Sequence, residues 1–476
     1  MSVAQIQQMV NRLSKLGDKL HLNREQAQNI LDNEILPTVT TGEEVGDVEY
    51  QNYTRSIMID VIRVMFNSAR WEDRFGAING SVLLIKYFYK KNADGYIDSS
   101  LSDFVWNTIR AMHVPKLMTD PEFRVRNQIG PLLKELIAKD QVKGAMHFER
   151  LKDMLLKNIE ETFTREPEGG VDASANPNVA SKTLEGGKQI QINKDESGKT
   201  MHDTEGWKSL ETSMRILQNI IEGIGVRLYD FNLDKILQAI IKGVDHINRF
   251  VREISYFVIN AIFTTSALIF KTGDDTKPEH VERFRSFCDD LLPIISKGLA
   301  DNWSQVRYAA SQAVRSFYVI AKEDDELREK YDDMLVPRMC LNRYYVAEGV
   351  KIYSNETWKF VHGEKGKEIL CKHAEAVCKF YISQSQADNH AVREAACHCI
   401  GELCTKVAVV DSKPFAPFVE DIMKALLDCF KDASWPVRDC ACLACASFVI
   451  AFPEEAKTIF DELCELWFNH LSDNIQ

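Results

Sequence analysis

One short pattern recurs along this chain, and its spacing restricts the folds that the chain can adopt. Each copy has a Val-Arg pair, an Asp four to six residues upstream, and mostly apolar or small residues that follow the valine at helical intervals. Residues at those intervals share one face of an α-helix, so every copy predicts a helix with one buried face. The three clearest copies are Asp301 with Val306 and Arg307, Asp388 with Val392 and Arg393, and Asp432 with Val437 and Arg438.

The pattern has a long and regular period. Val392 and Val437 are 45 residues apart, and a second amphipathic segment, residues 418–430, precedes the last copy. The repeating unit is therefore a helix, a short turn and a second helix. Repeats of roughly 40–47 residues are typical of HEAT and armadillo proteins. Two further copies are Asp120 with Val125 and Arg126, and Asp245 with Val251 and Arg252.

The runs DNWSQVRYAA from Asp301 and DASWPVR from Asp432 resemble the start of the second helix of a HEAT repeat. The resemblance implies an all-α fold, a right-handed α-solenoid of stacked antiparallel helix pairs. It also implies a structural ladder of Asp and Arg side chains between neighbouring repeats, in which removing one member leaves a partly buried charge unpaired. The ladder residues are Asp120, Arg126, Asp245, Arg252, Asp301, Arg307, Asp388, Arg393, Asp432 and Arg438, with Asp301 matched to Arg307, Asp388 to Arg393 and Asp432 to Arg438.

Two segments depart from the pattern. The run RWEDRFGA from Arg70 starts like a repeat but has Asp73 at the valine position. Residues 165–205 are rich in Gly, Ser, Asn, Lys and Glu and lack hydrophobic periodicity, which predicts a disordered insertion or loop. We therefore expect an N-terminal HEAT-like array over 1–164 and a C-terminal array over 206–476. Residues 471–476 resemble the opening of another repeat, so we expect that array to be cut mid-repeat, as in a fragment of a longer solenoid.

The charge and the cysteines bear on partners and compartment. The net charge of −12 disfavours direct nucleic-acid binding, which needs clustered Lys and Arg, and favours basic peptides or proteins. No run of about 18 apolar residues and no secretory signal is present, so no membrane insertion is expected. All twelve cysteines lie between Cys288 and Cys464. They are interpreted as reduced core thiols of a cytoplasmic protein, with a nuclear location as the alternative.

Several short motifs resemble zinc-binding or phosphate-binding sites, but the residues around them do not fit such sites. Cys397, His398 and Cys399 form one possible zinc group, and Cys442 with Cys445 another, but both lie inside periodic helices without the loop spacing of a zinc knuckle. The run SGKT over 197–200 resembles the end of a phosphate-binding loop and lacks its first glycine. The sequence thus predicts no catalytic residue, no cofactor and no metal, and a chain that is not an enzyme.

Three tryptophans and one arginine are the candidate partner contacts. Trp71, Trp303 and Trp435 are each expected at the turn between paired helices, where stacked repeats form a common edge, and Arg74 follows the first of them. Exposed aromatic residues in such a position can anchor a partner. In the alternative interpretation, each indole packs onto its own repeat.

The leading functional hypothesis is a protein-binding scaffold or adaptor of unidentified partner. A karyopherin-like transport receptor is a second hypothesis, because an acidic array suits basic cargo. A TOG-like tubulin-binding regulator is a third, since Trp71 and Arg74 resemble the tubulin-binding turn of those modules. The fourth is the regulatory helical part of a larger enzyme, such as an ATPase or kinase.

Overall fold

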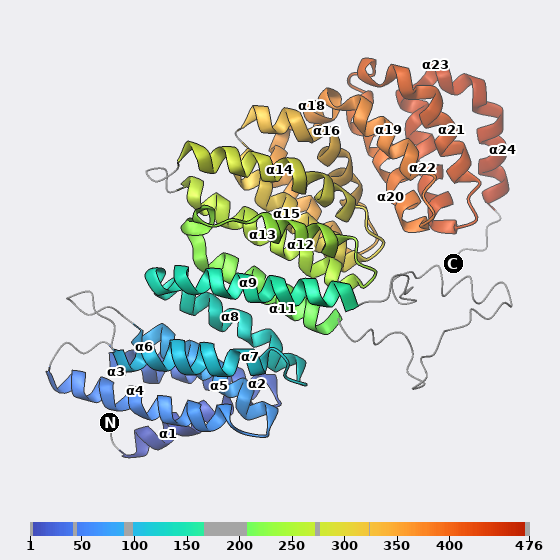
Figure 1. Ribbon diagram of the computed structural model, residues 1–476. Coiled ribbons are helices and arrows are strands. Elements are labelled where there is room, and N and C mark those ends of the chain that lie inside the picture. The colour runs from blue at the N-terminus through green and yellow to red at the C-terminus, as the bar shows by residue number, and fades with distance from the viewer. Residues whose placement is uncertain are drawn as a thin grey trace. The chain divides into compact units, whose positions relative to one another are not determined.

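The computed structural model describes residues 3–40, 45–89, 99–165, 207–271, 277–322 and 324–471, and within these ranges every regular element is a helix. The predicted all-α repeat fold is confirmed. Two compact units divide the chain, Met1–Asp275 and Thr276–Gln476. Both units stack helices in two layers (Figure 1).

Helices of the first unit pair in the order of the chain. Helices α5, α8, α11 and α13 pack each on the next and form one layer, while α9 and α12 lie beside each other in the second layer. The elements are α1 (Val3–Lys15), α2 (His21–Ile30), η1 (Leu31–Ile35), α3 (Leu36–Thr40), α4 (Val45–Phe66), α5 (Trp71–Phe88), α6 (Ser99–Asp103), η2 (Phe104–His113), α7 (Val114–Leu117), α8 (Phe123–Lys139), α9 (Gln141–Arg165), α11 (Trp207–Ile224), η3 (Gly225–Asp230), α12 (Asp234–Val244) and α13 (Arg249–Lys271).

The expected insertion, residues 165–205, lies outside the described residues except for Arg165, which ends α9. The same holds for the SGKT run over 197–200. The flanking helices α9 and α11 pack directly against each other, so the stack continues across the segment. The first compact unit, which contains both helices, ends at Asp275.

Helix α13 is long and apolar enough to cross a membrane by length and composition, although the sequence predicted no such span. About 67% of its most apolar window is buried, and it packs against α11 and α12. This is the environment of a core helix in a repeat stack.

The second unit contains four helix pairs, α14 with α15, α16 with α17, α19 with α20, and α21 with α22. The elements are α14 (Pro278–Gly298), α15 (Ser304–Ala321), α16 (Asp325–Asn342), α17 (Glu348–His362), η4 (Gly363–Lys365), α18 (Gly366–Lys372), α19 (Ala374–Gln384), α20 (His390–Leu403), η5 (Cys404–Ala408), η6 (Lys413–Phe418), α21 (Val419–Phe430), α22 (Trp435–Ala451), α23 (Pro453–Ala456), η7 (Lys457–Ile459) and α24 (Phe460–His470).

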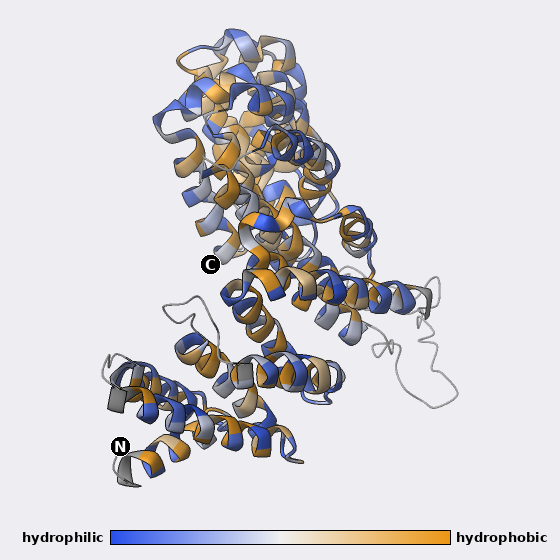
Figure 2. Cartoon of the chain, turned by 60° about the vertical axis from the view of Figure 1, so that its left-hand side comes forward, coloured by the Kyte–Doolittle hydropathy of each residue, from blue (hydrophilic) through white to orange (hydrophobic). Residues whose placement is uncertain are grey.

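The core of the second unit lies where the periodic residues were predicted. Val306, Val392 and Val437 are buried at the starts of α15, α20 and α22, and small residues follow them on the inner face. Small side chains let neighbouring helices approach closely, as where Gly401 of α20 lies against Ala444 of α22. Hydrophobic sides of the helices accordingly face one another (Figure 2). All twelve cysteines are free thiols, nine of them buried, as the core interpretation predicted.

Candidate functional site

In each clear repeat, an arginine near the start of the second helix stabilises the turn between the two helices by hydrogen bonds. Its guanidinium donates to backbone carbonyls of the turn that follows the preceding helix, where no helical N–H is available to them. The distances to the first such oxygen are 2.5 Å from Arg126 to Asp120, 3.0 Å from Arg252 to His246, 2.6 Å from Arg307 to Asp301, 2.8 Å from Arg393 to Ala387 and 2.9 Å from Arg438 to Asp432.

Two arginines, Arg393 and Arg74, also pair with the aspartate of the repeat that follows. Arg393 donates from Nε and Nη2 to the two carboxylate oxygens of Asp432, at 2.6 and 2.9 Å. Arg74 binds Asp120 in the same way, at 2.6 and 3.0 Å. The ladder therefore pairs the arginine of one repeat with the aspartate of the following one. The same-turn matches, such as Asp432 with Arg438, meet through the backbone carbonyl of the aspartate.

Three of the aspartates also cap their turns, because Oδ1 of the carboxylate accepts a backbone N–H. Asp120, Asp301 and Asp432 accept the backbone N–H of the residue two positions on, at 2.9, 2.8 and 2.7 Å. At the other two copies the expected aspartates, Asp245 and Asp388, are exposed. Neighbouring side chains cap those turns: His246 and Asn248 in the first, and Asn389 in the second.

Burial raises the pKa of Asp432, but the hydrogen bonds from Arg393 and from the Ser434 backbone outweigh it and leave the pKa below its usual value. Among the residues that the structure describes, no carboxylate accepts a hydrogen bond from the Arg307 guanidinium. This arginine is 1% exposed, stacks on Tyr345 at 4.0 Å and donates to Asn342 Oδ1 at 2.7 Å. Asn342, at the end of α16 in the repeat that follows Arg307, takes the place of the ladder aspartate.

Sequence reasoning missed further members of this set. Arg24 donates to the carbonyl oxygen of Asp18 at 2.7 Å, and Asp18 caps its own turn through the N–H of Leu20. Arg74 reaches the carbonyl oxygen of Ser68 at 3.1 Å. The signal was present as an arginine six residues after a capping residue, but no Val preceded either arginine.

The candidate contact residues differ in exposure. Trp71 is half-buried, packs edge-on against Phe75 at 6.4 Å and lies under the guanidinium of Arg124 at 4.9 Å. Trp303 is also half-buried. Trp435, at the start of α22, is 52% exposed. Arg74 is held by Asp120, so its guanidinium supports the repeat interface.

A groove of about 220 Å³ opens between α9 and α12 in the first unit. Buried Leu156, Ile159 and Ala239 and half-buried Phe163 form its apolar part. Exposed polar residues surround them: Glu160, Lys235, Gln238 and Lys242. A groove with an apolar floor and a polar rim has the composition of a site for a peptide or helix.

The rim of the groove carries two available positive charges. Lys235 and Lys242 are seven residues apart and therefore lie on the same side of α12. Neither lysine makes an ion pair with any residue that the structure describes. Sequence reasoning missed this site because its two walls lie on opposite sides of segment 165–205, and only the packing of α9 on α12 brings them together.

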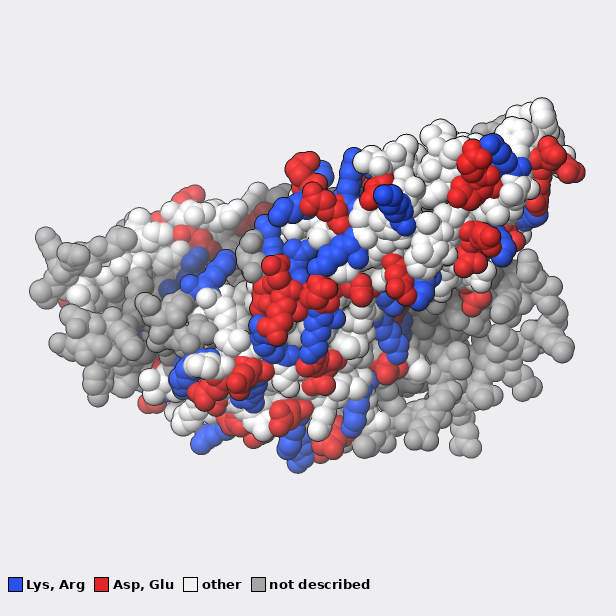
Figure 3. Space-filling view, turned by 90° about the horizontal axis from the view of Figure 1, so that it is seen from above, with Lys and Arg blue, Asp and Glu red and all other residues white. Residues whose placement is uncertain are grey.

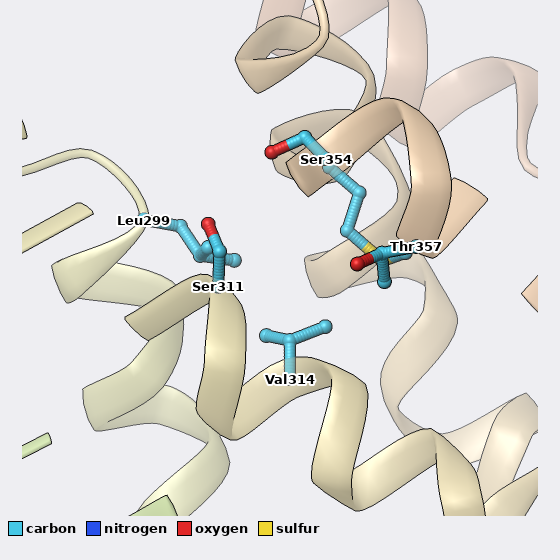
Figure 4. Close-up of a pocket in the computed structure, with 6 residues that line it drawn as sticks. Leu299, Ser311, Val314, Ser354 and Thr357 are labelled. Carbon is cyan, nitrogen blue, oxygen red and sulfur yellow. The ribbon is translucent and has the colours of Figure 1, made fainter. Parts of the chain in front are cut away.

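A second hollow, between α15, α16 and α17, is far smaller. Its volume is about 10 Å³, the space of roughly one water molecule, so it offers no room for an organic ligand. It is lined by Leu299, Ser311, Val314, Met339, Ser354 and Thr357 (Figure 4).

Surface charges of both signs lie side by side on the face drawn in Figure 3. Ion pairs between exposed or half-buried side chains include Arg285 with Asp324 at 3.0 Å and Lys431 with Glu462 at 2.6 Å. A face of mixed sign lacks the continuous positive strip that phosphate backbones require.

Residues 390–448, which form α20 to α22 and contain the Arg393–Asp432 pair, match the family model of the HEAT-like repeat. The chain is a helical-repeat protein of the HEAT/armadillo type. The same arginine–aspartate geometry recurs between Arg74 and Asp120, far outside the matched segment. No curated protein matches the sequence of this HEAT-type chain.

Solved structures similar to this HEAT-type chain include importin-β crystallised in an ammonium sulfate condition, at 13% identity over 98% of this chain and 53% of that one, with a TM-score of 0.43. Yeast importin-β (Kap95p) is 13% identical over 100% of this chain and 51% of its own, with a TM-score of 0.42. A designed armadillo repeat protein is 16% identical over 51% of this chain and 94% of its own, with a TM-score of 0.26. The chain spans about half the length of the two importin-β structures.

Proposed function

We propose that this HEAT-type chain is a non-catalytic protein-binding scaffold, and that the groove between α9 and α12 receives a segment of its partner. The observation that carries the proposal is the groove itself, which has a volume of about 220 Å³, an apolar floor and a polar rim. Apolar floors of this kind gain binding free energy when a partner side chain displaces water from them. The proposed partner contributes one or two apolar anchors to the floor.

The rim specifies the charge of that partner. Lys235 and Lys242 are about 10 Å apart along the axis of α12, since each helical residue rises 1.5 Å. An acidic amphipathic segment with carboxylates at a matching spacing satisfies both lysines. The charge of the whole chain is −12, which favoured a basic partner, but charges farther than a Debye length of about 8 Å act weakly on the groove. Among the charged residues of the rim, Lys235 and Lys242 outnumber Glu160, so the rim favours an acidic segment.

This geometry also bears on the alternatives. A karyopherin-like receptor for basic cargo needs an acidic surface, which the rim of this groove does not offer. The TOG-like hypothesis used Trp71 and Arg74, and both are engaged in repeat contacts. A scaffold and the regulatory helical part of a larger enzyme would use the groove in the same way.

Site-specific cross-linking tests the proposal. A photoreactive amino acid replaces Gln238 at the rim, and a control chain carries it at exposed Lys116 of α7, which does not line the groove. After irradiation in a cell extract, we expect one protein to be cross-linked from position 238, through an acidic segment. Equal labelling from both positions, or labelling from position 238 that spreads over unrelated proteins, would contradict the proposal.

A further inference from the structure

Three side chains with metal-binding atoms converge between α20 and α22. Glu394 and His398 are four residues apart on α20 and so share one side of that helix, and Cys440 faces them from α22. Their ligand atoms all lie within 4.8 Å of one another. His398 Nε2 is 3.0 Å from Cys440 Sγ. The group lies wholly within the second unit and joins two neighbouring repeats.

The surroundings hold the imidazole in place and leave one side accessible. Tyr344 stacks on the His398 ring with centroids 5.4 Å apart and planes at 14°. Cys440 is buried, while Glu394 and His398 are half-buried. Solvent or an ion can therefore reach the cluster from the side of the carboxylate and imidazole.

We propose that Glu394, His398 and Cys440 bind one zinc ion, with a water molecule or a partner side chain as the fourth ligand. Thiolate, imidazole and carboxylate are the three protein ligands that Zn²⁺ uses, and three such ligands plus one open position is an established coordination for this ion. Magnesium and calcium prefer sites made of oxygen alone. The mixed sulfur and nitrogen set thus selects a borderline-soft divalent ion.

Binding exchanges a proton for the metal. Without a metal, the Cys440 thiol and His398 Nε2 share a hydrogen bond of 3.0 Å. Zinc forms bonds to Sγ and Nε2, and the thiol proton leaves to solvent.

The sequence alone did not indicate that Glu394, His398 and Cys440 lie together. The zinc groups considered from the sequence were Cys397 with His398 and Cys399, and Cys442 with Cys445. Residues adjacent in a helix point in different directions, so Cys397 and Cys399 enter the core while His398 turns toward α22. Cys440 lies 42 residues after His398, close to one repeat period, and only repeat stacking brings the two together.

Zinc titration of the chelator-treated, reduced chain against a chromophoric competitor tests the proposal, with Co²⁺ as a spectroscopic probe. We expect one tightly bound equivalent and, with Co²⁺, a thiolate-to-metal charge-transfer band in the near-ultraviolet. Cys440→Ser should abolish that band, and His398→Gln and Glu394→Gln should each weaken zinc binding by about 10- to 100-fold or more. Cys442→Ser, a nearby half-buried thiol outside the cluster, is the matched control and should bind as the unmodified chain does.

Circular dichroism checks that each variant is folded. His398→Gln changes a half-buried residue and keeps the neighbouring thiol in place, so it separates loss of a ligand from loss of the fold. The proposal is overturned if folded His398→Gln binds zinc as tightly as the unmodified chain, or if the charge-transfer band persists in Cys440→Ser. Either result would leave a hydrogen-bonded Cys–His pair with no metal.

Discussion

At the scale of single residues, the pair of Arg393 and Asp432 links two repeats through a double hydrogen bond with both side chains largely buried. Asp432→Asn keeps an oxygen for the Ser434 N–H but removes the charge that balances Arg393. We expect a loss of about 2–4 kcal/mol in the free energy of unfolding, since a buried guanidinium is left without its counter-ion. Urea denaturation measures it. Asp439→Asn, an exposed change on the same helix, should stay within about 0.5 kcal/mol.

The Arg393–Asp432 pair also makes the free energy of unfolding depend on pH in the acidic range. Because the pKa of folded Asp432 lies below its usual value, the stabilisation is complete above that usual value, near 3.8, and is lost as the pH falls through the lower folded pKa. The difference in unfolding free energy between the unmodified chain and Asp432→Asn should therefore shrink as the pH is lowered below about 4. A difference that stays constant down to pH 2 would contradict the assignment.

His362 makes the free energy of unfolding depend on pH at less acidic values. Burial lowers its pKa to about 3, so the folded state resists a proton that the unfolded state accepts below its ordinary value of 6.5. Stability is then lost as the pH falls from 6.5 towards 3, by at most about 1.4 kcal/mol per pH unit for this group. Replacing His362 by Gln should flatten the curve of unfolding free energy against pH between about 6.5 and 3.

Substitutions of Trp71 and Trp435 distinguish a structural role from a role in partner binding. Trp71→Ala removes contacts with Phe75 and Arg124, so we expect a lower melting temperature. Trp435→Ala removes a side chain that is 52% exposed, so we expect the melting temperature to change little. If Trp435 contacts a partner, the second variant loses binding affinity while remaining as stable as the unmodified chain. Thermal melts followed by binding assays on both variants distinguish the two roles.

At the scale of elements, close backbone packing fixes where α5 lies against the turn between α1 and α2. A Cβ added at Gly17 would be 1.7 Å from the carbonyl oxygen of Glu72, so the two elements would have to separate. Gly17→Ala should cost about 2–4 kcal/mol or more of unfolding free energy. Gly349→Ala on α17, where nothing lies within 4 Å, should instead stabilise by up to about 1 kcal/mol. Equal effects at the two glycines would contradict the packing.

Sequence periodicity predicted the helices best where the buried face consists largely of small residues, as in α15, α20 and α22. It predicted less well where polar residues take over a ladder position, as with Asn342 opposite Arg307 and His246 in place of Asp245. The partner of each ladder arginine could not be read from its own turn, because the Asp432 carboxylate comes from the repeat that follows Arg393. Contacts between repeats depend on stacking, which one repeat alone does not specify.

At the scale of the whole molecule, each compact unit is a stack in which every repeat contacts its neighbours. Both candidate sites arise between elements distant in sequence: the groove joins α9 to α12, and the cluster of Glu394, His398 and Cys440 joins α20 to α22. Such sites escape motif searches since their residues are spaced by repeat lengths and insertions. Repeat architecture could thus be predicted from the sequence, while the positions available to a partner required the packed structure.

The most direct test of the scaffold account is a charge exchange at the groove. The acidic segment identified by cross-linking from position 238 is synthesised, and its affinity is measured for the unmodified chain and for Lys235→Glu/Lys242→Glu. The account predicts a loss of about tenfold or more. It also predicts that a segment with Lys in place of its carboxylates binds the double variant better than the unmodified chain. Equal affinities of the native segment for both chains would contradict the groove as the binding site.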